Sequence, residues 1–160
     1  MSEKEYEQAK NYAFRVLEKG LKSKRELEDK LKKREYSDEI IEKTLERMKE
    51  LGFIDDDYYA KRRVEKRSQG SKWGKMRIKQ ELYHKGIEKD VIDEAVENID
   101  QENELENAIA LAEKKMKSLS KYDEMTKKKK LFQFLQYRGY GYDICKRVLD
   151  RMKIKEDFYE

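Results

Sequence analysis

The sequence is poor in the residues that build loop-rich, disulfide-linked or metal-bound folds. Its 160 residues include no proline, 7 glycines, one cysteine and one histidine. Cys145 alone cannot close an internal disulfide, and Cys145 with His84 is too small a set for a structural zinc site. We therefore expect no disulfide and no bound metal.

Long apolar runs are also missing. None approaches the roughly 18 residues that a helix needs to cross a bilayer. The N-terminal residues Met-Ser-Glu-Lys-Glu-Tyr lack the apolar centre of a secretory signal. We expect a cytoplasmic protein with no membrane partner.

Charge of both signs is abundant instead. Charged residues make up 46% of the chain and apolar residues 37%, which approaches the composition of disordered proteins. Disorder also needs a large uncompensated charge, however, and 39 Lys and Arg against 35 Asp and Glu leave a net charge of only +4. The composition therefore favours a folded, highly charged helical protein.

A pattern of seven apolar positions occurs three times, at intervals of 51 and 53 residues. The copies read Leu27, Leu31, Tyr36, Ile40, Ile41, Leu45 and Met48, then Ile78, Leu82, Ile87, Val91, Ile92, Val96 and Ile99, and finally Leu131, Leu135, Tyr140, Ile144, Cys145, Leu149 and Met152. A recurrence of this length is typical of small helical repeats.

Each copy predicts three helices. Within the pattern, spacings of three and four residues predict two helices, and an alanine-containing stripe upstream predicts a third. Ser23 and Glu26 have the spacing of a capping box. Gly86 and Gly139 stand where the second helices of the later copies should end. The first copy has Glu35 there, so we expect a different turn.

The sequence therefore predicts an all-α fold of three tandem three-helix repeats. The expected boundaries are residues 4–52, 53–100 and 101–153. Units of about 50 residues are near the lower limit for an independent core, so neighbouring repeats should support one another. We expect an elongated, curved molecule, which suits binding along an extended partner.

Two short motifs suggest ligand chemistry, but each has a better interpretation. The segment Gly70–Met76 differs from a phosphate-binding loop, because three residues separate its glycines instead of four and Met76 replaces the magnesium-binding hydroxyl. The run Asp55–Asp57 would spread its carboxylates by about 100° per residue on a helix. It therefore predicts a helix N-cap at Asp55 and an acidic first turn rather than a metal site.

The remaining chemically active residues indicate no enzyme. His84 has no nucleophile or orienting carboxylate at a recognisable motif spacing, so we interpret it as solvated. Cys145 aligns with Ile41 and Ile92 and should be a small buried apolar side chain. We predict no catalytic residue and no cofactor.

Positive charge is concentrated in the middle of the chain. From Lys61 to Lys89 there are eleven Lys and Arg against three Glu, a local charge of +8. A second basic run lies near residue 130. The candidate partner-binding residues are Arg62, Arg63, Lys66, Arg67, Lys72, Lys75, Arg77 and Lys79, with Lys127, Lys128, Lys129, Lys130 and Arg138. For any one of them a solvated helix face is the simpler interpretation, but the +8 segment as a whole favours an acidic partner.

The central segment resembles a known family. Gly52-Phe53-Ile54-Asp55-Asp56-Asp57-Tyr58-Tyr59-Ala60 is similar to a stretch of the RecX regulatory proteins. Gly74, Arg77-Ile78, Glu81-Leu82 and Lys85-Gly86-Ile87 resemble the helical block that follows it. The similarity extends along nearly the whole chain, because that family is also built from tandem three-helix repeats.

The resemblance implies a bacterial, non-enzymatic regulator of recombination and DNA repair in the SOS response. Such a protein binds in the groove of the RecA–DNA filament and restrains ATP hydrolysis and strand exchange by RecA. We expect a monomer whose partner is the RecA filament, with some contact to DNA. A general nucleic-acid-binding helical protein is the alternative, which a steep salt dependence of DNA affinity would favour.

Overall fold

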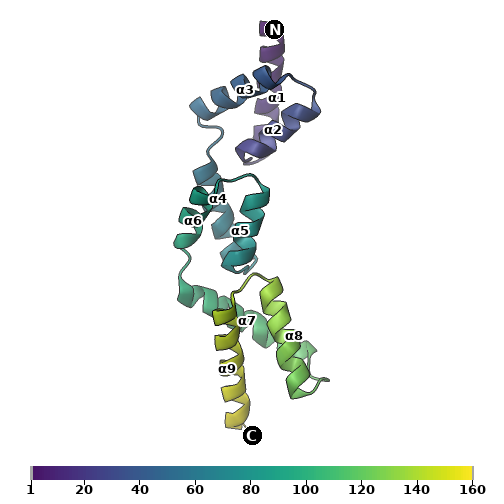
Figure 1. Ribbon diagram of the computed structural model, residues 1–160, viewed down its shortest axis with the longest axis vertical. Helices are drawn as coiled ribbons and strands as arrows, with labels where there is room; N and C mark the ends of the chain where they lie inside the picture. Colours follow the sequence, from purple (N-terminus) through teal and green to yellow (C-terminus); the bar gives the residue numbers. More distant parts are fainter. Residues whose placement is uncertain (1, 160) are drawn as a thin grey trace. The chain divides into compact units, whose positions relative to one another are not determined.

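The computed structural model describes residues 2–159, and the side chains of residues 2–152. Over this range the chain forms α-helices, one π-helical segment and no strand (Figure 1). In chain order these are α1 (Glu3–Glu18), α2 (Lys24–Lys33), α3 (Asp38–Glu50), α4 (Asp56–Glu65), the π-helix η1 (Lys66–Gly70), α5 (Lys75–His84), α6 (Lys89–Glu97), α7 (Gln101–Ser118), α8 (Glu124–Tyr137) and α9 (Tyr142–Tyr159). The predictions of an all-α fold and of three helices per repeat are confirmed.

Local capping fixes where several helices begin. Ser23 and Glu26 form the predicted capping box at the start of α2. Asp55 accepts a hydrogen bond from the Tyr58 backbone N–H at 3.1 Å, which confirms it as the cap of α4. Asp123 does the same for α8 through the Thr126 N–H at 2.7 Å. These side chains satisfy backbone donors that have no partner within the helix.

The second helix of each repeat ends on a residue with positive φ. Gly86 and Gly139 have φ of 79° and 99°, and Glu35 has φ of 64°. The later repeats close the turn with a six-residue hydrogen bond, as in the bond from Ile87 N–H to the Leu82 carbonyl at 3.1 Å. The described chain forms no such bond at Tyr36. The first turn therefore differs, as predicted, although Glu35 keeps the left-handed conformation.

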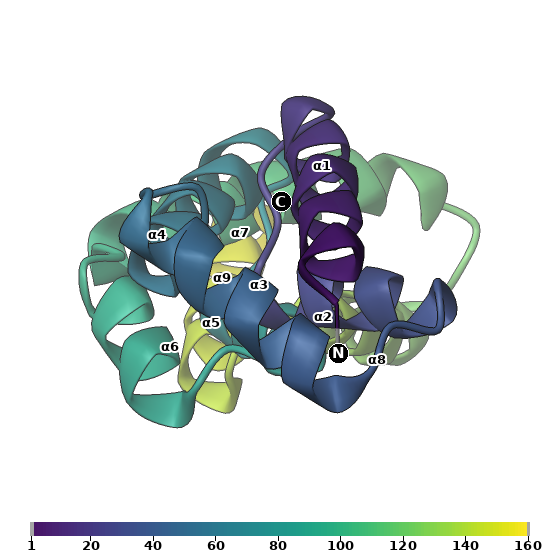
Figure 2. The same ribbon diagram turned by 90° about the horizontal axis from the view of Figure 1, so that it is seen from above.

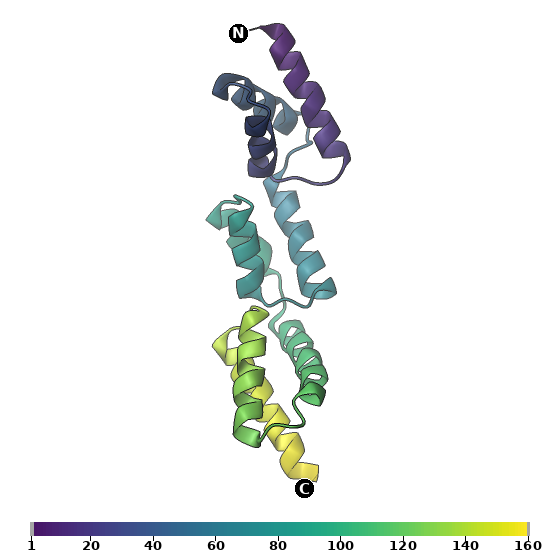
Figure 3. The ribbon, with the colours of Figure 1, turned by 90° about the vertical axis from the view of Figure 1, so that its right-hand side faces the viewer.

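Two apolar cores hold the first and third repeats. In the first, Leu27, Leu31 and Ile40 are fully buried, and α3 packs on α1 and α2 (Figure 2). In the third, Leu131, Leu135 and Cys145 are buried among α7, α8 and α9 (Figure 3). None of the apolar positions that define the repeat pattern is exposed. The pattern therefore marks the buried side of the helices.

The helices of the middle repeat are divided between two compact units. The chain up to residue 62 packs with residues 82–95, and residues 63–81 pack with the chain from residue 96 onward. The middle repeat thus contributes to both units, as expected for repeats too small to fold alone.

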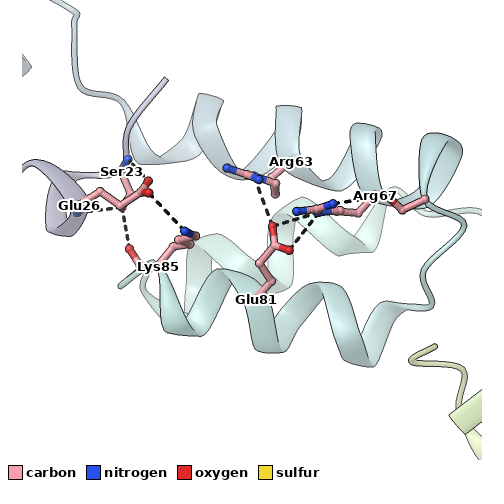
Figure 4. A network of polar contacts seen from close by, with 7 residues as sticks. Ser23, Glu26, Arg63, Arg67, Glu81 and Lys85 are labelled. Atoms are coloured by element: carbon pink, nitrogen blue, oxygen red, sulfur yellow. Dashed lines mark hydrogen bonds and ion pairs between the residues drawn. The ribbon is translucent and has the colours of Figure 1, made fainter. Parts of the chain in front are cut away.

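In the first unit, the second repeat satisfies the N-terminus of α2. The Asp56 carboxylate accepts from the Lys24 backbone N–H at 2.9 Å. The Ser23 hydroxyl donates to the Lys85 carbonyl at 2.7 Å, and the Lys85 ammonium pairs with Glu26 at 3.3 Å (Figure 4). We call this set of contacts the first joint.

In the second unit, the third repeat supplies acceptors for the backbone N–H groups at the N-terminus of α5. The Glu104 carboxylate accepts from the Lys75 N–H at 2.9 Å, and the Arg138 carbonyl accepts from the Gly74 N–H at 2.8 Å. The Gly139 carbonyl accepts from the Met76 N–H at 3.1 Å. This second joint repeats the first at equivalent positions. Lys24 and Lys85 stand 51 and 53 residues before Lys75 and Arg138, as in the repeat pattern, and Asp56 and Glu104 each stand four residues before a buried alanine, Ala60 and Ala108.

The joints require glycine where backbones meet. A Cβ on Gly86 would lie 2.5 Å from the Arg25 Cβ. A Cβ on Gly139 would overlap the Arg77 Cβ and lie 2.6 Å from the Arg77 backbone nitrogen. Such contacts are too short for backbone atoms to accommodate without a shift, so both glycines are needed for close packing as well as for positive φ.

We expect Gly139→Ala to destabilise the protein by about 2–5 kcal/mol, because it adds steric overlap to the cost of a left-handed alanine. Gly52→Ala is the matched control, since Gly52 also has positive φ but nothing lies within 4 Å of its Cβ position. The control should cost about 1 kcal/mol. Urea unfolding measures both, and equal losses would show that the second joint is not closely packed.

The first joint should also make stability depend on pH. Burial acts to raise the pKa of Glu26, but hydrogen bonds from Ser23 and Tyr59 and the charge of Lys85 outweigh it, so the pKa lies below 4.5. A lowered folded-state pKa contributes stability above the unfolded-state pKa that is lost as the pH falls through the folded-state value.

Glu26→Gln should therefore destabilise the protein by a constant amount from neutral pH down to about pH 5, with the difference from wild type shrinking at lower pH. Thermal melts between acid and neutral pH measure this difference. Glu94→Gln, at an exposed position of α6, is the control. A Glu26 effect that did not change with pH would contradict the assignment.

Candidate partner-binding surface

The predicted partner-binding cations lie on α4, η1, α5, the loop before α5, and α8 with its C-cap. Arg62, Lys66, Lys79 and Lys129 are exposed. The others, Arg63, Arg67, Lys72, Lys75, Arg77, Lys127, Lys128, Lys130 and Arg138, are half-buried. The set therefore divides into exposed side chains and side chains that the protein partly covers.

Glu81 holds two of the predicted arginines. Its carboxylate, with a side chain only 13% exposed, pairs with Arg63 at 3.4 Å and with Arg67 at 3.0 Å (Figure 4). Because Glu81 comes from α5 and the arginines from α4 and η1, the ion pairs tie these elements together. Part of the +8 charge of this segment is thus already balanced within the fold.

Aromatic rings contact Arg67 and a further arginine, Arg77. The guanidinium carbons of Arg67 and Arg77 lie 4.3 and 4.0 Å from the centre of the Trp73 ring. Arg77 also lies 4.8 Å from the centre of the Tyr137 ring. Arginine prefers such stacking, and each contact contributes about 0.5–2 kcal/mol depending on burial. We call Arg67, Trp73, Arg77 and Tyr137 the stacked cluster.

The π-helix η1 explains how Trp73 comes beside Arg67. The helix widens here to a six-residue hydrogen bond, with the Ser71 N–H donating to the Lys66 carbonyl at 3.2 Å. The Trp73 N–H then donates a hydrogen bond to the Arg67 carbonyl at 2.9 Å, and Lys72 adopts a positive φ of 55°. Nothing in the sequence periodicity indicates this turn, so the stacked cluster was not predicted.

The segment that resembles a phosphate-binding loop is already occupied. The first N–H groups of α5, on Gly74, Lys75 and Met76, donate to acceptors of the third repeat in the second joint. The Tyr140 hydroxyl donates to the Lys72 carbonyl at 2.5 Å. A phosphate would need the same donors. The geometry therefore agrees with the rejection of a nucleotide loop.

The lysine run on α8 does not form one patch. Consecutive helical residues point about 100° apart, so Lys127 to Lys130 spread around the helix. The Lys130 ammonium lies 4.7 Å from the centre of the Tyr122 ring, and the Arg138 guanidinium lies 5.3 Å from that of Phe134. Of this run, only Lys129 is exposed.

The two chemically active side chains lie apart from this surface. Cys145 is fully buried, as predicted, and burial raises the pKa of its thiol to about 11. His84 is exposed, as predicted, with its ring 5.8 Å from that of Tyr83. Among the described residues, no group of three or more His, Cys, Asp or Glu side chains is arranged to hold a metal ion. No helix of the described chain has the length and apolarity needed to span a bilayer.

Family models match the chain in three consecutive segments. They are described as the first, second and third three-helix domains of RecX, and they match residues 9–48, 55–96 and 102–149. The segments fall within the three predicted repeats.

Individual proteins agree with these matches. Regulatory protein RecX of Clostridium botulinum (strain Alaska E43 / Type E3) is 39% identical over 150 residues, which cover 92% of this chain and 69% of that protein. Regulatory protein RecX of Chlorobium phaeobacteroides (strain BS1) is 36% identical over 95% of this chain and 98% of its own length. The crystal structure of RecX from Lactobacillus salivarius superimposes with a TM-score of 0.87 at 26% identity, covering 94% of this chain and 98% of that one.

The stacked cluster generates a prediction that needs no partner. Arg77→Lys keeps the charge but loses the planar group over Trp73, so it should cost about 1 kcal/mol of stability. Trp73 is the sole tryptophan, so loss of the stacked group should make acrylamide quench the tryptophan fluorescence more strongly. Arg151→Lys is the control, at an exposed position of α9, and should change neither property. Unchanged quenching in Arg77→Lys would contradict the stacking.

Proposed function

The chain belongs to the RecX family of regulatory proteins, and we propose that it is a non-enzymatic regulator that binds the RecA recombinase filament. In this proposal it restrains ATP hydrolysis and strand exchange by RecA, and so acts in recombination, DNA repair and the SOS response. The observation that carries the proposal is the ordered match of all three repeats to the three RecX domains. We further propose that it acts as a cytoplasmic monomer, with repeats at 4–52, 53–100 and 101–153.

The proposed contact surface uses the exposed cations of the middle repeat. Arg62, Lys66 and Lys79 project from α4, η1 and α5 and are exposed. The half-buried side chains of Arg63 and Arg67 are oriented by Glu81 and Trp73. Pre-oriented guanidinium groups lose little conformational entropy when they bind carboxylates or phosphates, so this arrangement supports docking on an acidic surface.

The arrangement also supports a role without catalysis. Two carboxylates of the second unit, Glu81 and Glu104, are engaged by Arg63, Arg67 and the Lys75 N–H. A general acid or base needs to reach a substrate proton, whereas these groups are committed to structural contacts. The partner surface is therefore proposed as a binding surface alone.

The test is a charge reversal that leaves the structural arginines intact. The triple variant Arg62→Glu, Lys66→Glu, Lys79→Glu should need roughly tenfold more protein for half-inhibition of RecA ATPase at low salt, because complementary charge speeds encounter and fixes orientation. The difference from wild type should narrow as added salt screens the charges.

The matched control is Lys4→Glu, Lys33→Glu, Lys49→Glu, which makes the same charge change at exposed positions of the first repeat. It should inhibit like the wild type. Equal inhibition by both triple variants would exclude this face as the contact surface. If the wild type bound DNA with a steep salt slope but left RecA activity unchanged, the general nucleic-acid-binding alternative would replace the proposal.

A further inference from the structure

A basic groove lies on the first repeat, outside the surface described above. It runs between α1 and α2 and encloses about 680 Å³. Its lining consists of Tyr12, Arg15, Val16, Glu18, Lys19, Lys22, Lys30 and Arg34. The local charge count along the sequence did not reveal it, because its cations come from two helices and the loop between them.

The charge of this groove is strongly one-sided. Five cations and one carboxylate line it. In the described part of the chain, none of the five cations is in an ion pair. The hollow between α2 and α3 on the same repeat differs, since four carboxylates and three lysines line it. The basic groove is therefore a local feature of the α1–α2 side.

The cations stand on both walls of the groove. Arg15 and Lys19 are one turn apart on α1, and Lys30 and Arg34 are one turn apart on α2 and its C-cap. Side chains at this spacing have Cβ atoms about 5–6 Å apart. Lys22 adds a charge from the loop. Two facing rows of cations suit a chain of phosphates better than a single anion.

An aromatic ring accompanies the cations. Tyr12 is half-buried in the lining, and the Arg34 guanidinium lies 4.3 Å from the centre of its ring. Tyr12 also packs against the core of the first repeat, so its ring orients the Arg34 guanidinium in the groove. A positively charged groove of this kind follows the backbone of single-stranded nucleic acid.

A simpler interpretation explains only part of this groove. Cations near the C-termini of α1 and α2 offset the negative ends of the helix dipoles. That effect accounts for Arg15 and Lys30 in the last turns of these helices and for their C-cap residues, Lys19 and Arg34. It does not account for Lys22, which lies in the loop, nor for the convergence of all five cations with Tyr12 on one concave surface.

We propose that the groove between α1 and α2 binds the phosphate backbone of single-stranded nucleic acid, with Tyr12 orienting Arg34 toward the phosphates. This inference does not rest on RecA regulation, because the groove residues are separate from the proposed contact surface of the middle repeat. It assigns nucleic-acid contact to the first repeat.

The test measures binding of a short fluorescent oligothymidylate to the full chain by anisotropy over a range of salt concentrations. Lys19→Gln, Lys30→Gln removes one cation from each wall and should weaken binding at low salt by roughly tenfold or more. If both lysines contact phosphates, the slope of log affinity against log salt should become shallower by about 1.4. Tyr12→Leu should weaken binding severalfold, because Arg34 loses the ring that orients it, with the salt slope unchanged.

The matched control is Lys32→Gln, Lys49→Gln, which makes the same charge change on the same repeat outside the groove. It should bind oligothymidylate like the wild type. Equal loss in both double variants, or no binding by the wild type at low salt, would overturn the proposal. So would a groove variant that lost RecA inhibition while keeping oligothymidylate affinity, because the groove would then contact protein.

RecA ATPase measured on the same proteins separates this inference from the proposed function. A wild type that bound oligothymidylate through the groove but did not inhibit RecA would refute the regulatory role and leave the groove assignment intact. Circular dichroism melts of the three groove and control variants identify any variant that fails to fold. The single substitutions Lys19→Gln and Lys30→Gln, each expected to flatten the slope by about 0.7, test the proposal if the double variant is unfolded.

Discussion

The N-termini of α2 and α5 place backbone N–H groups where their own helices cannot satisfy them, and each following repeat supplies the acceptors. The Asp56 carboxylate accepts from the Lys24 N–H in the first joint, and the Glu104 carboxylate accepts from the Lys75 N–H in the second. A buried N–H without an acceptor costs free energy comparable to a lost hydrogen bond. Each joint therefore links a local requirement of one helix to the folding of its neighbour.

The joints also explain which cations remain available to a partner. The Arg138 carbonyl and the Gly139 backbone close on α5, which brings Arg77 against Tyr137. Trp73 and Glu81 then engage Arg67 from the other elements of the second unit. As a result the arginines of the basic segment mainly stabilise the fold, and the exposed lysines contribute most of the charge that reaches solvent.

Removing acidic side chains of the joints from water costs free energy, and their hydrogen bonds offset that cost. Burial raises the pKa of Asp56, although the Lys24 N–H partly opposes the shift. Burial and the neighbouring Glu104 carboxylate raise the pKa of Tyr140, so its hydroxyl stays protonated and donates to Lys72. These contacts favour one alignment of the helices that they join, because hydrogen bonds weaken steeply away from their preferred geometry.

Local periodicity and capping chemistry were enough to predict the helices, the repeat pattern, the Asp55 cap and the burial of Cys145. These features depend on residues three or four positions apart, or on the same position in successive repeats, and both are visible along the chain. The left-handed Glu35 was not foreseen, because that conformation is rare for a residue with a Cβ.

The sequence also named the cations of the basic segment but not their different roles. Whether an arginine stacks on Trp73, pairs with Glu81 or faces solvent depends on side chains that only tertiary packing brings within a few ångströms. The same reason applies to the groove between α1 and α2, whose charge comes from residues that are dispersed in the sequence and converge only when the two helices pack.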